Sequence, residues 1–274
     1  MNRVAYINAR LIDPASGWDG PGTLFTEGGL IADLQPDDAV SDGTEVVDCG
    51  GRVLCPGLID MRVFVGEPGA EHKETLASAS EAAAAGGVTC IIMQPNTEPV
   101  IDDVPLVEYI KRQARDKAKV RIHPMAAITR GLRGEQMAEL GLLSKADAVA
   151  FTDADRTVTN AQVLRRVLSY ASAFDLLVCQ YLEEPNLASN GVMNQGEIAM
   201  RLGLPGIPTQ AETIMVERDL RLVEMTGGRY HAACLSTSQA IEAIARGKAL
   251  GLPVTAAAAV HNFALNEGAV GEYR

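Results

Sequence analysis

Hydrophobic and polar positions follow two different rhythms along this chain, and the change falls near residue 55. Before it, short apolar runs are separated by closely spaced turn residues, with a hairpin predicted around Glu27-Gly28. This pattern is typical of a small antiparallel sheet. After it, apolar runs that suit buried strands alternate with segments of helical periodicity, which is typical of βαβ units with parallel strands. We therefore expect two parts, 1–55 and 56–274.

The second part is predicted to contain seven strands separated by helices. The final helix is expected to begin at Ser236 as its N-cap, with Gln239 three residues later, and to end at Gly251. Seven strands of this kind favour an α/β fold of the (β/α)₈ barrel type over an open sheet. The predicted strands are 58–65, 89–93, 121–127, 148–152, 176–181, 230–235 and 253–258; the predicted helices are 71–85, 105–116, 135–140, 160–174, 210–226 and 237–250.

One strand of the expected eight is missing from this pattern. Only the sixteen residues 259–274 follow the seventh predicted strand, too few for another helix, an eighth strand and its closing helix. Two parallel edges would then remain unpaired, and such edges are templates for aggregation. We expect either a barrel truncated after about seven strands, as in a fragment of a longer polypeptide, or a gap covered by another chain. We favour the fragment.

Composition narrows the classes of partner. The 24 Lys and Arg residues against 35 Asp and Glu residues give a net charge of −11, which disfavours nucleic acid and anionic membranes as partners. Hydrophobic residues make up 47% of the chain, enough for a large core, and no apolar run is long enough to span a membrane. The five cysteines form no C-x-x-C pair, so neither a disulfide framework nor a structural zinc site is expected. These features predict a soluble, cytoplasmic protein.

Chemistry in such a barrel sits at the C-terminal ends of the strands. The first predicted strand carries PGLID followed by EPGAEHKE, and the second is followed by QPNTEPV. Later strand ends carry FTDAD, CQYLEEPNL and YHAACLSTS. Together these segments resemble the class I dihydroorotases of the amidohydrolase superfamily, in order and over essentially the whole chain.

The resemblance implies a fold and a reaction. The fold is a metal-dependent (β/α)₈ barrel with a small β-sandwich portion, to which residues 1–55 would contribute. The reaction is the reversible ring closure of carbamoyl aspartate to dihydroorotate in pyrimidine biosynthesis. In that reaction a zinc pair lowers the pKa of a bridging water and polarises the ring amide carbonyl. Its ligands are histidine imidazoles and a bridging carboxylate.

This sequence departs from the family at most of those ligand positions. The first-strand Asp-x-His-x-His motif is replaced by a run that puts Arg62 and Phe64 at the histidine positions. The histidines expected on strands five and six are Tyr181 and Cys234. Asp153 on strand four is the only retained ligand, and the catalytic aspartate of strand eight would lie beyond residue 274. No catalytic residue is therefore assigned, and no metal cofactor is expected.

Substrate anchoring is altered as well. The family arginine that pairs with the substrate carboxylate corresponds to Gly66, whereas the asparagine that shares this role is kept as Asn96. Loss of a charged hydrogen bond of this kind forfeits roughly 1.5–3 kcal/mol. Asn96 is thus the one substrate-binding residue that the resemblance carries over.

The replacement residues allow more than one interpretation. Arg62 could substitute for the metal charge by pairing with Asp153 and lowering the pKa of that carboxyl group, or it could reach solvent; we favour the ion pair. Phe64 and Tyr181 are interpreted as fillers of a vacated cavity. Cys234 could be a soft ligand or a nucleophile, but an inert buried thiol is favoured because no histidine is expected beside it.

The four histidines are not expected to rebuild a site. His72 lies in the loop before the first helix, and His123 and His231 lie early or midway in their strands. His261 follows the seventh strand and is the least defined. We expect structural roles for all four.

Three functions remain open from the sequence. The first is a non-catalytic dihydroorotase homologue that acts as a structural partner of aspartate transcarbamoylase, or that self-associates. The second is an active cyclic amidohydrolase with an atypical metal site, in which case zinc would be the cofactor. The third is a module that binds carbamoyl aspartate through Asn96 without turnover. We favour the first.

Overall fold

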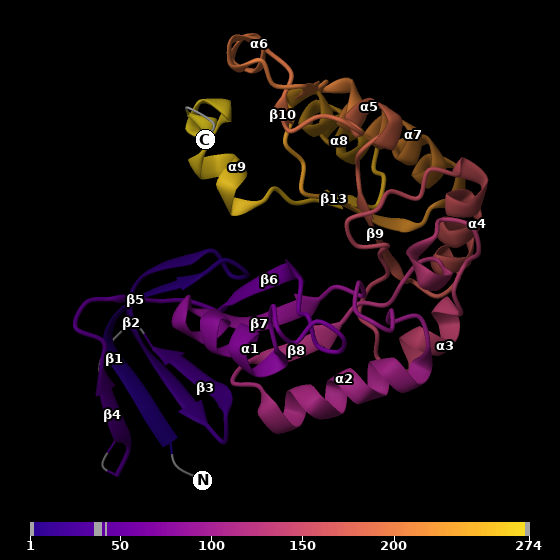
Figure 1. The fold of residues 1–274 in the computed structure, drawn as a ribbon. Coiled ribbons are helices and arrows are strands. Elements are labelled where there is room, and N and C mark those ends of the chain that lie inside the picture. Colours follow the sequence, from indigo (N-terminus) through magenta and orange to yellow (C-terminus); the bar gives the residue numbers. More distant parts are fainter. Residues whose placement is uncertain (1–2, 36–39, 42, 272–274) are drawn as a thin grey trace. The chain divides into compact units, whose positions relative to one another are not determined.

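The computed structural model describes residues 3–35, 40–41 and 43–271. It divides the chain into two compact units, Met1–Leu58 and Ile59–Arg274, whereas the sequence pattern placed the boundary at 55. Each unit is described by itself, and Figure 1 gives the labels of the elements.

The first unit is a five-stranded sheet in the order β3-β2-β1-β4, with β5 also paired to β1. Its strands β1, β2 and β3 are antiparallel, and the predicted hairpin is confirmed by the β2–β3 pairing across Gly28 and Gly29. Strands β4 and β5 run parallel to β1, so the expectation of a wholly antiparallel sheet is wrong. A two-residue hairpin can join antiparallel neighbours only, so β4 and β5 require a longer connection to lie parallel to β1. The strands are β1 Arg3–Asp13, β2 Trp18–Glu27, β3 Leu30–Gln35, β4 Glu45–Asp48 and β5 Val53–Leu54.

The second unit is built on two three-stranded sheets, ordered β6-β7-β8 and β13-β12-β9. Phe151 links them, because it forms parallel bridges with Ala126 on one side and Val178 on the other. The predicted strand 148–152 is therefore present only as this bridging residue. The strands are β6 Leu58–Val63, β7 Val88–Met93, β8 Arg121–Pro124, β9 Leu177–Tyr181, β12 Arg229–Ala233 and β13 Val254–Ala256, with the short pair β10 Met193–Asn194 and β11 Gly206–Ile207 in a loop.

Helices follow the strands along the chain, as the alternating pattern predicted. Helices α7 and α8 pack on one another beside β12 and β13 (Figure 1). The main helices are α1 Leu76–Ala85, α2 Val104–Lys117, α3 Leu140–Lys145, α4 Ala161–Ser172, α7 Gln210–Thr226 and α8 Ser238–Ala249. Shorter ones are η1 Arg130–Leu132, α5 Pro185–Ala188, α6 Glu197–Leu202, α9 Val260–Ala264 and η2 Glu267–Val270.

Three helix predictions need correction. The helix predicted at 71–85 begins only at Leu76, because Thr75 is its N-cap. The helix expected at 135–140 is absent, and α3 begins at Leu140, because Met137 bridges to Thr129 in an antiparallel pair instead. The N-cap of α8 is Thr237 rather than Ser236, since the Thr237 hydroxyl accepts from the Ala240 amide at 3.3 Å.

Side chains of the parallel strands alternate between two faces. On β9, Val178 belongs to the large cluster between strands and helices, whereas Cys179 belongs to a small cluster with Met125 and Ala150. This alternation has the period of two residues that strands impose. Tyr181 therefore shares a face with Cys179, at the C-terminal end of the strand. Within the described residues, none of the helices is both long and apolar enough to cross a membrane.

Candidate functional site

The C-terminal ends of several strands bring polar groups together around Arg62. Near the end of β6, the Arg62 Nη1 donates to Cys234 Sγ at 3.3 Å, and its Nη2 donates to the carbonyl oxygen of Ala154 at 3.0 Å. The guanidinium carbon also lies 5.2 Å from the centroid of the Tyr181 ring. This distance lies within the range of a cation–π interaction. Four segments that are distant in the sequence thus meet at one cation.

The backbone around this cation is unusual. Ala154 has φ of 57° and Cys234 has φ of 56°, the left-handed region that residues with a side chain rarely adopt. Such conformations cost of order 1–3 kcal/mol each and persist only where the surrounding fold holds them. Because both residues contact Arg62, the cation is bound by backbone segments that the fold maintains in a strained form.

Asp153 does not pair directly with Arg62. Its carboxylate, which is 1% exposed, accepts from the Thr129 amide at 2.9 Å and from the Thr129 hydroxyl. Burial raises the pKa of Asp153, and the Thr129 hydrogen bonds oppose this only in part. We predicted a direct or single-water contact between Arg62 and Asp153; the direct contact is absent, and the predicted lowering of this pKa is wrong. The carboxylate turns toward the loop that follows β8, and Arg62 reaches the next residue instead, at its carbonyl.

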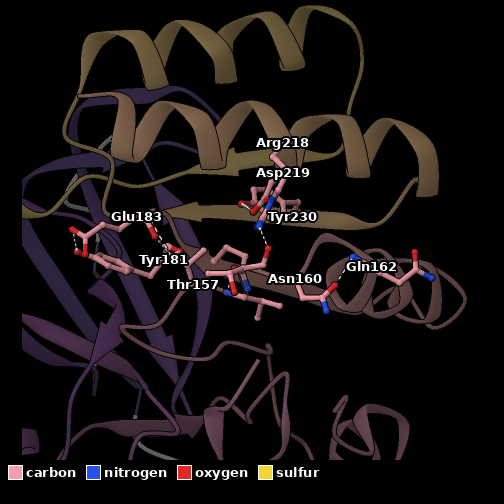
Figure 2. A network of polar contacts seen from close by, with 11 residues as sticks. Thr157, Asn160, Gln162, Tyr181, Glu183, Arg218, Asp219 and Tyr230 are labelled. Carbon is pink, nitrogen blue, oxygen red and sulfur yellow. Dashed lines mark hydrogen bonds and ion pairs between the residues drawn. The ribbon is translucent and has the colours of Figure 1, made fainter. Parts of the chain in front are cut away.

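Tyr181 and Phe64 differ in their surroundings. Tyr181 is half-buried, and its hydroxyl donates to Glu183 Oε2 at 3.3 Å, a contact that Figure 2 shows. Burial raises the pKa of Tyr181 to about 12, with the Glu183 charge adding to the effect. Phe64 is 38% exposed, so the described residues do not enclose its ring, and its role as a filler of the vacated metal cavity stays a prediction.

Glu212 binds the segment that follows Cys234 at the C-terminal end of β12. The sequence did not identify Glu212 as a site residue. This buried carboxylate on α7 accepts from the Ser236 amide at 2.8 Å and from the Thr237 amide at 2.9 Å, and it also binds both hydroxyl groups. A cavity of about 100 Å³ lies here, lined in part by Tyr181, Cys234 and Glu212. One feature of the sequence could have identified Glu212: it is an acidic residue at a position of α7 where the helical spacing places buried apolar residues.

A second buried network lies behind β9 and β12, and Figure 2 shows it from close by. Asp219 on α7, which is 0% exposed, accepts from Tyr230 Oη at 2.7 Å and from Arg218 Nε at 2.7 Å. Arg218 also donates to the Thr159 carbonyl at 2.8 Å. Burial raises the pKa of Asp219 to about 6, against the opposing effect of Arg218. This network fastens α7 to β12 and to the start of α4.

A protein-family profile described as dihydro-orotase-like matches residues 51–240, which is most of the second unit. The chain belongs to this family. It is 44% identical over 266 residues to the dihydroorotase of Solibacter usitatus, with 97% of this chain and 62% of that protein covered. It is also 43% identical over 276 residues to the dihydroorotase of Anaplasma phagocytophilum, covering 98% of this chain and 61% of that one. The chain therefore spans about three fifths of the length of these relatives.

Solved structures support the same fold. The L-hydantoinase of Arthrobacter aurescens superimposes with a TM-score of 0.79 at 21% identity, covering 94% of this chain and 58% of that one. The D-hydantoinase of a Thermus species gives a TM-score of 0.72 at 20% identity, with coverages of 96% and 58%. At this identity the likeness concerns the fold alone: an α/β fold of the amidohydrolase barrel type.

The dihydroorotase-like family raises the question of whether these residues could hold a zinc pair. Zinc in catalytic sites takes three or more protein ligands, usually imidazoles and carboxylates. Within residues 3–35, 40–41 and 43–271, no group of three or more His, Cys, Asp or Glu side chains is placed to hold a metal ion. Arg62 is a permanent cation at one of the replaced positions, and the Asp153 carboxylate is engaged by Thr129. The donor set therefore does not fit a zinc pair.

The histidines lie apart from one another. His231 is buried, and its Nδ1 lies 2.8 Å from Thr255 Oγ1, so a structural role is supported for it. His72, His123 and His261 are exposed and lie on separate elements or loops. Asn96, the substrate-binding candidate, is half-buried, and its Oδ1 is a buried acceptor with no hydrogen-bond partner among the described residues. Its role in binding stays a prediction.

Proposed function

We propose that this chain is a dihydroorotase-like protein of pyrimidine biosynthesis that is catalytically inactive and serves as a structural partner of aspartate transcarbamoylase. Membership of the dihydroorotase-like family and the 44% identity to a dihydroorotase support the pathway. The observation that carries inactivity is the position of Arg62, bound to Cys234 Sγ and to the Ala154 carbonyl. A permanent cation at a ligand position repels Zn²⁺, whereas a histidine would donate a lone pair.

The partnership rests on the resemblance together with this loss of ligands. A protein that keeps the family fold but not its metal ligands is retained for its shape or for its surfaces. Aspartate transcarbamoylase catalyses the step that makes carbamoyl aspartate, so a dihydroorotase-like subunit beside it suits the pathway. Self-association is the alternative assembly. The alternative function is an active cyclic amidohydrolase with an atypical metal site, in which zinc would be the cofactor.

We expect the purified chain to hold no stoichiometric zinc and to hydrolyse dihydroorotate no faster than a heat-denatured sample. The reason is the absence of a set of three metal ligands among the described residues. The measurement is metal analysis by plasma mass spectrometry together with a spectrophotometric assay after incubation with zinc, and an active dihydroorotase serves as the positive control. One or two zinc ions per chain with turnover above the heated control would overturn inactivity and establish the alternative.

We expect the chain to co-elute with aspartate transcarbamoylase from the same organism in a complex heavier than either protein alone. The measurement is size-exclusion chromatography with light scattering on each protein and on the mixture. An acidic protein unrelated to the pathway, mixed in the same ratio, controls for non-specific association. Separate elution with this chain in a defined oligomer would replace the proposed partner with self-association.

A further inference from the structure

Helix α2 exposes one face along its whole length. The helix contacts α1 and α3, and it connects β7 to β8, which each have a neighbour on both sides (Figure 1). Its outer face is therefore bounded by described elements on both flanks. Exposed residues recur there at alternating steps of three and four, the spacing of one helical face. They are Pro105, Glu108, Arg112 and Arg115, followed by Lys119 just beyond the end of the helix.

The C-terminal end of this face is basic, although the chain as a whole is acidic. Residues 111–121 include six Lys or Arg residues and one acid, whereas the whole chain has a net charge of −11. Arg112 and Lys119 form no ion pair with any of the described residues, and Arg115 pairs only with the adjacent Asp116. We call Arg112, Arg115 and Lys119 the basic end of α2. Their charges are exposed and available to an acidic surface.

The N-terminal end of α2 borders a groove with acids on its rim. This cavity of about 290 Å³ is lined by the carboxylates of Asp102, Asp103 and Glu139 and by Leu142, which is 54% exposed. One cation, Arg130, also lines it and pairs with Glu139 at 3.1 Å, so the acids outnumber the cations. We call this cavity the acidic groove. It offers negative charge together with exposed apolar surface.

The two ends of α2 complement one another across a two-fold axis. A two-fold interface uses the same patch on both copies, so a patch with opposite charges on the two sides of the axis matches itself. Glu108 and Arg112 lie near the middle of the exposed face. An axis between them places Glu108 of each copy opposite Arg112 of the other. The same antiparallel pairing brings each basic end to the acidic groove of the other copy and opposes the two helix dipoles.

We propose that this chain forms a two-fold dimer through α2, with the basic end of each copy on the acidic groove of the other. The face of one helix buries less than the about 1,200 Å² of standard interfaces, so we expect a weak, reversible dimer. A nucleic acid is the other class of partner for a basic surface, and the net charge of −11 disfavours it. The dimer goes beyond the function proposed above and requires neither inactivity nor the transcarbamoylase.

Two charge-reversed forms of the full chain test the pairing. The acidic form carries Arg112→Glu, Arg115→Glu and Lys119→Glu, and the basic form carries Glu108→Lys and Glu139→Lys. Each form opposes like charges when it pairs with itself, and every change acts twice across the axis, so we expect each dissociation constant to rise by at least about tenfold. An equal mixture opposes unlike charges, so the dimer is expected to return. Sedimentation velocity from micromolar to millimolar chain concentration measures all of these.

The matched control reverses two charges outside the proposed interface. Arg165→Glu with Arg166→Glu changes two exposed residues of α4 and is expected to dimerise like the parent. Circular dichroism melts establish that each form is folded. If a reversed form does not fold, Arg112→Glu and Glu108→Arg test the central pair in the same way, apart and mixed. Added salt is expected to weaken the parent dimer, because it screens exposed charges.

The remaining outcomes overturn the dimer in distinguishable ways. A parent that stays monomeric at millimolar concentration would overturn it, as would a dimer that both reversed forms keep. Heparin binding by a monomeric parent, lost in the acidic form, would assign the basic end to a polyanion instead. A monomeric parent that binds aspartate transcarbamoylase only when the basic end is intact would overturn the dimer and support the proposed function. A dimer that does not bind the transcarbamoylase would support this inference and contradict that function.

Discussion

Replacing Asp219 with alanine is expected to destabilise the fold by about 3–5 kcal/mol at neutral pH, the cost of breaking a buried ion pair from one side. The Asp219 carboxylate accepts from Tyr230 Oη and Arg218 Nε, both at 2.7 Å, and its own side chain is 0% exposed. Alanine leaves the phenol and the guanidinium without their acceptor in a site that water does not reach freely. Urea denaturation followed by circular dichroism measures the loss.

The matched control for this variant is Asp175→Ala. Asp175 pairs with Arg229 at 3.1 Å but is 82% exposed at its side chain. Exposed pairs contribute about 0–1 kcal/mol, so this control is expected to melt close to the parent. If Asp219→Ala lost no more stability than Asp175→Ala, the network in Figure 2 would not hold α7 to β12.

The same carboxyl group makes stability depend on pH. Its folded pKa of about 6 lies above the ordinary value of 3.8, so between these values the folded chain binds more protons than the unfolded chain. The stabilisation from Asp219 protonation is complete below about pH 4 and is lost as the pH rises through about 6, by roughly 3 kcal/mol in total. Asp219→Asn removes this dependence. The parent-minus-variant difference in unfolding free energy is therefore expected to fall over that window, and a flat difference would contradict it.

The sequence correctly predicted those helices and strands in which buried residues recur at a regular spacing along the chain. Helix α7 was placed at 210–226 and is observed as Gln210–Thr226, because Met215, Val216, Leu220 and Val223 mark one buried face. The hairpin at Gly28 could also be predicted from the sequence. Glycine in a turn between two segments of alternating apolar residues favours antiparallel pairing of those segments. The family motifs then supplied the barrel-type fold, which a local pattern cannot specify.

What the sequence could not predict is where side chains turn at the strand ends. Arg62 and Asp153 both lie there, but Asp153 binds Thr129 in a nearer loop, and its buried position is satisfied by that hydroxyl and amide. The local cap rule also failed, because Ser236 and Thr237 both fit an N-cap, and it is the Thr237 hydroxyl that accepts from the Ala240 amide. Choices of this kind depend on tertiary neighbours rather than on spacing.

The last prediction concerns Glu212, whose carboxylate accepts from the amides of Ser236 and Thr237 at the start of α8. Replacing Glu212 with alanine is expected to cost about 2–3 kcal/mol, because the amides of Ser236 and Thr237 and both hydroxyls lose a charged acceptor. Glu212→Gln keeps one acceptor oxygen and is expected to lose less. Glu224→Ala, on the exposed surface of the same helix, is the control and is expected to change stability by less than about 0.5 kcal/mol. Thermal melts compare the three.

Replacing Glu212 with alanine is also expected to affect Cys234. The strained backbone of Cys234 lies just before Ser236 and Thr237, the two residues that Glu212 binds. Released from Glu212, the segment 234–237 can relax away from Arg62, so alkylation of Cys234 by neutral iodoacetamide should accelerate in Glu212→Ala but not in Glu224→Ala. Unchanged reactivity together with the expected loss of stability would show that Glu212 caps α8 without positioning the thiol.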